Sequence, residues 1–251
     1  MLDNKKLYTE EKNMKENCNS QLCNKVGSKG FSPCHVAEVG VWHPNTSNIF
    51  RYIKDGVKAT LVEPDIESIE LIKNKFNANN VTLHEVAVCD FNGEVELCKR
   101  GSSTFVSNLP SSPALVNDDC NVSESDSFIA KAIKFSEIDD GTIELLSIDT
   151  EGCEWFVIKN MISRPVVISI ETHGGIYKNP YFSELQEWLE SNNYRLWYMD
   201  KSDSVYVLNG TIIISILDEV GLFLSRIKIK LKSMKKRVSK QIKGKRKLIF
   251  V

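Results

Sequence analysis

The stretch that decides the fold runs from His35 to Val88 and reads HVAEVGVWHPNTSNIFRYIKDGVKATLVEPDIESIELIKNKFNANNVTLHEVAV. Short apolar runs alternate here with segments of helical periodicity, and glycine or proline separates several of them. The pattern predicts strand 35–40, helix 49–54, strand 59–63, helix 66–76 and strand 81–88. Strands that alternate with helices build a parallel sheet, so this stretch is the first half of a doubly wound α/β sheet.

The same alternation continues toward the C-terminus. Asn92-Gly93 predicts a turn before a half-exposed strand at 94–98, and residues 101–125, rich in Ser, Asn, Asp and Pro, predict a long surface loop or lid. The further elements expected are strand 143–149, helix 154–161, strand 166–171, helix 181–191 and the antiparallel pair 194–199 and 204–208. The predicted fold class is therefore α/β, a doubly wound, Rossmann-like sheet that is mostly parallel, with an antiparallel closing strand.

Composition favours a soluble globular protein. The 251 residues are 42% hydrophobic and 26% charged, which excludes wholesale disorder. Seven cysteines, an odd number without a Cys-x-x-Cys pair, speak against a disulfide framework or a zinc site and favour a reducing compartment. The polar N-terminus shows no signal peptide. We expect a cytoplasmic protein with a polar leader at 1–33, an α/β domain at 34–210 and a tail at 211–251.

Acidic side chains end five of the predicted strands. The carboxyl ends of parallel strands meet at one edge of an open α/β sheet, where ligands bind. Simple solvation explains any single acid, but a whole set at one edge points to a binding site. Its members are Glu38, Glu63, Asp90, Asp149 with Glu151, and Glu171, which His173 follows closely.

Glu63 is the sharpest of these signals. An acid about 20 residues after the first glycine turn commonly accepts ribose hydroxyls in nucleotide-binding α/β folds, and Glu63 lies 23 residues after Gly40. Trp42 and Pro44 stand where further glycines are expected, so a pyrophosphate is poorly supported. A cofactor with ribose and adenine but no phosphates fits better.

Five motifs occur in order between about residues 34 and 210. They are Glu38-Val-Gly-Val-Trp-His-Pro44 with Ser47-Asn48, Leu61-Val-Glu-Pro64, Ala87-Val-Cys-Asp90 with Gly93, Ser147-Ile-Asp-Thr-Glu-Gly-Cys-Glu154, and Arg164-Pro165 leading to Ile170-Glu171. In this series the sequence resembles the FkbM-type methyltransferases. Two positions depart from the pattern, because Ser147 replaces a common lysine and Glu38 replaces the commoner aspartate.

The resemblance implies a class I methyltransferase that uses S-adenosyl-L-methionine, usually to methylate a hydroxyl of a sugar or natural product. The cofactor-binding residues that follow from the motifs and strand ends are Glu38, Gly40, Asn48, Glu63, Val88, Asp90 and Asp149.

Methylation of a hydroxyl also needs an in-line acceptor and a group that takes its proton. His173 is the first candidate for this base, because its ordinary pKa suits neutral pH, and Asp149 and Glu151 are the alternatives. Asp149, Glu151, Glu171 and His173 together could hold a divalent cation, but we assign no metal ligand.

The tail is strongly basic. Residues 226–251 contain twelve Lys or Arg and no acid, while the preceding 225 residues hold 20 basic and 33 acidic residues. Apolar residues at 217, 220, 224, 227, 231, 234 and 238 predict an amphipathic helix with heptad-like spacing. The helix could pack on its own domain, join a second copy in a homo-oligomer, or lie on an anionic membrane.

The expected function is O-methylation of a sugar hydroxyl in a glycan or glycolipid precursor, in the cytoplasm and near the inner membrane surface. One alternative is a methyltransferase for another small molecule or for nitrogen. Another is a non-catalytic nucleotide-fold module that docks to membrane glycan-assembly enzymes. The missing Gly-x-Gly-x-x-Gly disfavours an NAD-type oxidoreductase, and no motif for a specific nucleic acid is visible.

Overall fold

A mostly parallel sheet forms the centre of the protein. The computed structural model describes residues 16–100, 103–107, 116 and 127–249. Its main sheet has the order β12-β13-β9-β8-β1-β2-β3. The bounds are β1 (His35–Val39), β2 (Lys58–Val62), β3 (Val81–His84), β8 (Leu145–Ile148), β9 (Val167–Glu171), β12 (Tyr194–Met199) and β13 (Asp203–Leu208). β3, β2, β1, β8 and β9 are parallel, and β13 and β12 are antiparallel, so the predicted fold class is confirmed.

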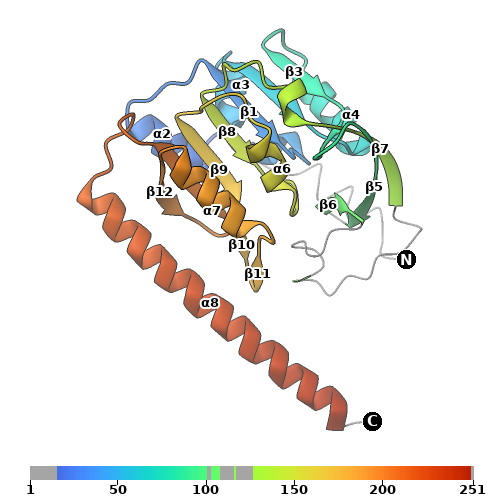
Figure 1. Ribbon diagram of the computed structural model, residues 1–251, viewed down its shortest axis with the longest axis vertical. Coiled ribbons are helices and arrows are strands. Elements are labelled where there is room, and N and C mark those ends of the chain that lie inside the picture. Colours follow the sequence, from blue (N-terminus) through green and yellow to red (C-terminus); the bar gives the residue numbers. More distant parts are fainter. Residues whose placement is uncertain (1–15, 101–102, 108–115, 117–126, 250–251) are drawn as a thin grey trace.

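Helices cover both faces of this sheet (Figure 1). On one face lie α2 (Gln21–Ser28), α3 (Phe50–Lys54) and α4 (Ile66–Lys75), packed against one set of strand side chains. On the other lie α6 (Glu154–Lys159) and α7 (Phe182–Ser191), packed against the alternate set. Successive strand residues point to opposite faces, so apolar strands buried on both sides supply two cores.

α2 belongs to the core although it precedes the predicted α/β domain. The Ser20 hydroxyl caps it by accepting the Cys23 N–H at 3.1 Å, and Leu22, Cys23 and Val26 are buried. The predicted polar leader thus contains a helix, while its residues 1–15 lie outside the described chain.

A smaller sheet stands beside the first. It has the order β4-β7-β5-β6, from β4 (Ala87–Val88), β5 (Gly93–Arg100), β6 (Ser103–Val106) and β7 (Ser127–Ile133). The strand predicted at 81–88 is therefore two strands in two sheets, because β3 pairs with β2 while β4 pairs with β7. β7 has no counterpart in the sequence prediction, and β6 occupies the start of the segment predicted as a loop. The rest of that loop, apart from residues 107 and 116, lies outside the described chain.

The predicted tail helix is α8 (Ile216–Ile249), a helix of 34 residues that runs past the body to the C-terminal end (Figure 1). Lys29 Nζ lies 2.5 Å from the Asp218 carboxylate, and the Trp197 indole N–H donates to Asp218 at 3.2 Å. These contacts fix the first turn of α8 to α2 and β12. Among the described residues, no helix combines the length and apolarity that crossing a membrane requires.

Candidate functional site

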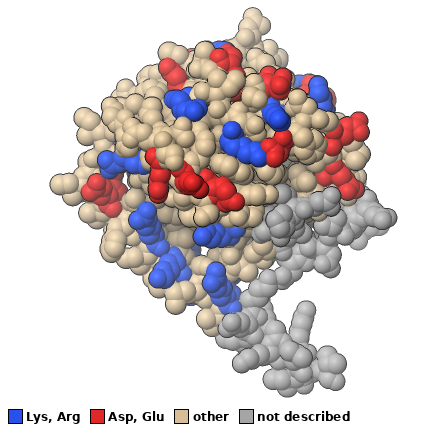
Figure 2. All heavy atoms as spheres, viewed as in Figure 1, with Lys and Arg blue, Asp and Glu red and all other residues tan. Residues whose placement is uncertain are grey.

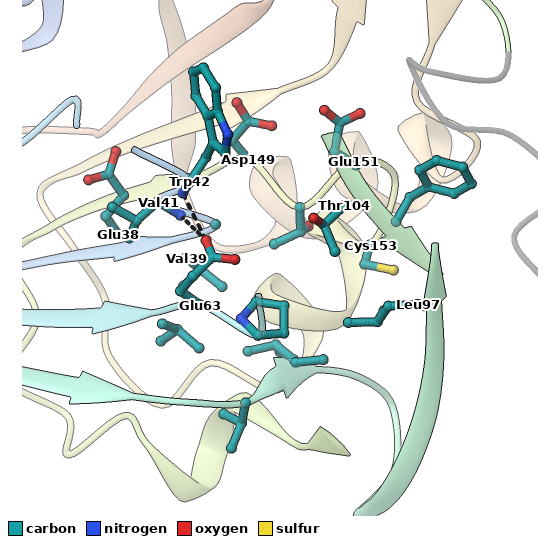
Figure 3. A pocket seen from close by; sticks show the side chains of 18 of the residues that line it. Glu38, Val39, Val41, Trp42, Glu63, Leu97, Thr104, Asp149, Glu151 and Cys153 are labelled. Carbon is teal, nitrogen blue, oxygen red and sulfur yellow. Dashed lines mark hydrogen bonds between the residues drawn. The ribbon is translucent and has the colours of Figure 1, made fainter. Parts of the chain in front are cut away.

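A cavity of about 230 Å³ opens at the carboxyl ends of β1, β2 and β8, the edge that the sequence predicts (Figure 3). Six of the seven predicted cofactor-binding residues line it, namely Glu38, Gly40, Asn48, Glu63, Val88 and Asp149. Glu151, a predicted catalytic residue, lines it too. The seventh, Asp90, is absent from the lining and is ion-paired with Lys159 at 2.6 Å.

Gly40 lets two strands approach each other beneath the cavity. Its φ is +83°, and a Cβ placed there would lie 1.7 Å from the carbonyl oxygen of Asp149. Only glycine satisfies both conditions, since an L side chain is strained at this φ and would collide with backbone. The single glycine of the first turn is therefore needed to bring the β1 and β8 loops together.

Glu38 holds the loop that follows β1. It is buried, and its carboxylate accepts the Ser47 hydroxyl and the Asn48 N–H, the latter at 2.8 Å. The Asn48 side-chain amide in turn donates to Ser147 Oγ at 3.1 Å. Burial, only partly offset by these two bonds, raises the pKa of Glu38 to about 7.

Glu63 closes the same loop from the side of β2. Its Oε2 accepts the N–H groups of Val41 and Trp42 at 2.9 and 2.8 Å (Figure 3), and its Oε1 accepts that of Asp65 at 3.1 Å. A carboxylate offers about four lone-pair positions, so Oε1 retains one for a hydroxyl donor. Glu63 can thus hold the loop and still accept a hydroxyl of a ribose.

The opposite wall of the cavity is apolar. Val86, Ala87 and Val88 contribute to it from β4 and its approach, and Leu97 and Phe105 from β5 and β6. Sequence reasoning placed Val88 there but missed Leu97, Thr104 and Phe105. The alternation of Ser103-Thr104-Phe105-Val106 was the available signal, hidden within a segment rich in loop-forming residues.

A group of acidic side chains lies beside the cavity, at the ends of β8 and β9. Carboxylate oxygens of Asp149, Glu154 and Glu171 all lie within 4.8 Å of one another. Solvent reaches Asp149 through the cavity, although protein surrounds it elsewhere. Burial, and then the charges of neighbouring acids such as Glu151, raises the pKa of Asp149, and burial with the Asp149 charge raises that of Glu171. This edge of the site therefore favours a proton or another positive charge.

Glu154 shapes the loop that carries this group. It is fully buried at the start of α6, and its Oε1 accepts the N–H groups of Thr150 and Gly152, both at 3.0 Å. Its other oxygen accepts the Asn179 amide. Glu151 between these residues has a φ of 55°, the left-handed conformation that non-glycine residues rarely adopt. Glu154 thus stabilises a loop that presents Glu151 to the cavity.

His173 lies elsewhere. It belongs to the hairpin β10 (His173–Gly174) and β11 (Tyr177–Lys178), and lines a second hollow of about 920 Å³ between that hairpin and α8. Its Nε2 lies 3.3 Å from the Asp200 carbonyl and its Nδ1 lies 2.9 Å from the Thr172 hydroxyl. A carbonyl only accepts, so Nε2 carries the hydrogen and Nδ1 is the basic nitrogen. Burial lowers the pKa of His173, which keeps the ring neutral.

The predicted site residues therefore fall into three groups. Glu38, Gly40, Asn48, Glu63, Val88, Asp149 and Glu151 share one cavity. His173 lines the second hollow, and Asp90 contacts α6. The considered cation set of Asp149, Glu151, Glu171 and His173 differs from the observed carboxylate group, in which Glu154 joins Asp149 and Glu171.

The sequence also matches the model of a known protein family. The family model described as Methyltransferase FkbM domain matches residues 35–196. No curated protein matches the chain.

Among solved structures, the methyltransferase domain of bacterial CtHen1-C is similar with a TM-score of 0.43 at 11% identity, covering 76% of this chain and 99% of that one. Ribosomal protein L11 methylase from Lactobacillus delbrueckii subsp. bulgaricus has a TM-score of 0.40 at 11% identity, with 74% of each chain covered. The glycopeptide N-methyltransferase MtfA has a TM-score of 0.39 at 7% identity, covering 76% of this chain and 89% of that one.

Proposed function

This chain belongs to the FkbM methyltransferase family and is an S-adenosylmethionine-dependent enzyme, and from that premise we propose that it methylates a hydroxyl of a sugar in a glycan or glycolipid precursor. The observation that carries the proposal is the position of Asp149. It lines the predicted cofactor cavity and belongs to the cluster of acidic side chains beside that cavity. The family assignment also decides against the alternative of a non-catalytic module.

The residues of the cavity fit S-adenosylmethionine. Glu63 has a lone-pair position left for a ribose hydroxyl, and the apolar wall of Val86, Ala87 and Val88 suits an adenine ring. The side of Glu38 and Asp149 is acidic and suits the cationic methionine end. No pyrophosphate-binding glycine series is needed, because this cofactor has no phosphates.

The residues of the site then have separable roles. When bound, S-adenosylmethionine supplies a methyl group on a sulfonium, which an acceptor oxygen attacks in line. Glu63, Glu38 and Gly40 orient the cofactor, and Asp149 accepts the proton that the acceptor hydroxyl loses. Its raised pKa makes the Asp149 carboxylate a stronger base than an ordinary aspartate. Glu151 faces the same cavity and orients the acceptor.

Cofactor binding is tested first, by titration calorimetry of the full chain with S-adenosylmethionine. We expect micromolar affinity for the wild type. Glu63→Ala should weaken binding by about tenfold or more, because it leaves a ribose hydroxyl without a hydrogen-bond acceptor in a buried site. Glu67→Ala, an exposed acid on α4, is the control. Equal affinity of the Glu63→Ala variant and the wild type would remove the ribose role.

The acceptor is tested with methyl-labelled S-adenosylmethionine. The probes are a water-soluble glycan extract, a glycolipid extract and an amine-bearing peptide. We expect the label on a sugar oxygen, located by fragmentation in a mass spectrometer. Label found only on nitrogen, or only on products without sugar, would contradict the proposed substrate class and leave methyl transfer itself intact.

A cytoplasmic location is part of the same proposal. The six cysteines among the described residues all carry free thiols, and a reducing compartment keeps them so. Four of the six are buried and pack as small apolar side chains.

A further inference from the structure

The apolar stripe of α8 faces solvent. Its members, which we call the outer stripe, are Leu217, Val220, Leu224, Ile227, Leu231, Met234 and Val238. Each is between 42% and 82% exposed. The predicted amphipathic helix therefore does not use this face to pack on its own domain, and a contiguous exposed apolar face marks an interaction site.

Another face of α8 meets the body. Leu222, Ser225, Ile229 and Ser233 are partly buried, at the spacing of one helical face, and α8 packs beside β12. The Asp218 contacts with Lys29 and Trp197 anchor the first turn in this orientation. The body thus holds the helix by this face, and of the outer stripe only Met234 lines the hollow between α8 and the hairpin.

Cations border the outer stripe on both sides. Between Arg226 and Val238 there are seven Lys or Arg, all of them exposed, and no acid. Lys228 and Lys235 directly follow stripe positions, and Lys230 and Arg237 directly precede them. Figure 2 shows Lys and Arg side chains (blue) along α8, below a body that carries both basic (blue) and acidic (red) side chains. Apolar positions flanked by long cationic side chains suit a surface with an apolar interior and anionic headgroups.

A second copy of this chain fits the stripe poorly. If the outer stripe supplied the core of a two-stranded coiled coil, the flanking positions would be those that face each other across the two helices. From Ile227 to Val238 these positions are Lys228, Lys230, Lys235 and Arg237. A parallel pair would place Lys230 opposite Lys235 of the second copy, and an antiparallel pair would bring cations together wherever these segments overlap. The same four charges attract an anionic surface.

We propose that α8 docks the protein on an anionic lipid bilayer, with the outer stripe inserted at the boundary of headgroups and acyl chains. The helix lies along the surface, because its cations occupy both borders of the stripe. This inference rests on α8 alone and does not depend on the sugar acceptor proposed above. It brings the enzyme to the surface where a glycolipid acceptor would be found.

The test is co-sedimentation of the full chain with vesicles. One set is pure phosphatidylcholine, and the other contains phosphatidylglycerol in addition. We expect binding to the anionic vesicles to be stronger by about tenfold or more, and to weaken as salt is raised. Equal binding to the two sets of vesicles would overturn the proposal.

Two variants separate the apolar from the charged contribution. Leu231→Ser with Met234→Ser removes two apolar side chains from the stripe. Its matched control replaces Ile129 and Ile162, apolar residues of the body with similar exposure, by Ser. A second variant neutralises the four flanking cations to Gln, and its control neutralises Lys54, Lys58, Lys73 and Lys75. We expect each α8 variant to lose at least about tenfold in affinity for anionic vesicles. Both controls should bind as the wild type does.

The outcomes are distinguishable from misfolding and from self-association. Thermal melts and cofactor titration of each variant report whether the body is intact. A wild-type dimer in sedimentation equilibrium that Leu231→Ser with Met234→Ser dissociates, together with no binding to anionic vesicles, would assign the stripe to a second copy and overturn the proposal.

Discussion

At the scale of single residues, Gly40 and Gly56 form a matched pair. Their φ values are +83° and +82°, but a Cβ at Gly40 would collide with Asp149 backbone, whereas one at Gly56 would meet open space. We predict that Gly56→Ala costs about 1 kcal/mol through φ alone. Gly40→Ala should cost more than about 2 kcal/mol, because the β1 and β8 loops must separate, and should abolish cofactor binding.

Urea unfolding of both variants measures the two costs, and calorimetry measures cofactor binding. Similar destabilisation by the two substitutions would mean that the close approach at Gly40 is not required.

Glu38 makes a pH-dependent contribution to stability. Its pKa in the fold, about 7, lies above the ordinary value of 4.5, so the folded protein binds the extra proton between these pH values. The stability from Glu38 is therefore fully present below pH 4.5 and is lost as pH rises through 7. From pH 4.5 to 8 we predict that wild type loses on the order of 3 kcal/mol relative to Glu38→Gln.

Unfolding free energies of the two proteins across this pH range check the prediction, with Glu96→Gln as the exposed control. A difference between wild type and Glu38→Gln that stays constant with pH would show that Glu38 does not titrate there.

Asp149 and His173 compete for the role of base. Asp149 lines the cavity at the ends of β1, β2 and β8, whereas His173 lines the second hollow and its basic nitrogen faces Thr172. We predict that Asp149→Asn lowers kcat by about 10²- to 10⁴-fold, and His173→Gln by less than about tenfold. Asp149 must be unprotonated to act as a base and its pKa is raised, so the wild-type rate should increase as the pH rises. The reverse order of the two variants would make His173 the base, as its sequence position first suggests.

At the scale of elements, the Asp218 carboxylate anchors the first turn of α8 to the body. Asp218 accepts from Lys29, Trp197 and Ser215, and these donors hold its pKa below the ordinary value. We predict that Asp218→Ala frees α8 from β12 and changes the fluorescence of Trp197, while the melting temperature of the body changes little. The control is Glu219→Ala, which removes a more exposed pair with Arg195. Unchanged fluorescence would mean that other contacts fix α8.

The elements also show where local patterns fail. Residues 81–88 have the apolar continuity of one strand, but the chain leaves the main sheet after His84 and Ala87 pairs with β7 instead. β7 itself follows a segment rich in polar residues, and no local signal says which partner it has. Pairing between strands is decided by residues distant in sequence. A local pattern therefore predicts where a strand lies more reliably than which strand it pairs with.

At the scale of the whole molecule, cofactor binding should stabilise the α/β body and leave α8 independent. At a hundredfold excess over Kd, a ligand adds about 2.7 kcal/mol to stability, which raises the melting temperature of a protein of this size by roughly 5–10 °C. We predict this rise with S-adenosylmethionine for wild type and for the cation-neutralised α8 variant, but not for Gly40→Ala. A rise of the same size in Gly40→Ala would place the cofactor outside the cavity of Figure 3.

The sequence by itself determined the fold class, the edge of the sheet at which the cavity opens, and seven of the residues that line that cavity. These follow from short-range rules. Apolar runs define strands, helices between them force a parallel arrangement, and parallel strands end at one edge. Glu38, Gly40, Glu63 and Asp149 could therefore be expected at one edge of the sheet, and in the structure they line one cavity.

Only the tertiary structure decided which acids meet and which way α8 faces. Glu154 has the pattern of an ordinary helix-start acid, yet its burial joins it to Asp149 and Glu171, while His173 turns toward α8 instead. The heptad-like stripe is equally compatible with packing inward or outward until the Asp218 anchor fixes the rotation of the helix. Side-chain neighbours and helix orientation depend on contacts between distant segments, and periodicity in a sequence carries no information about them.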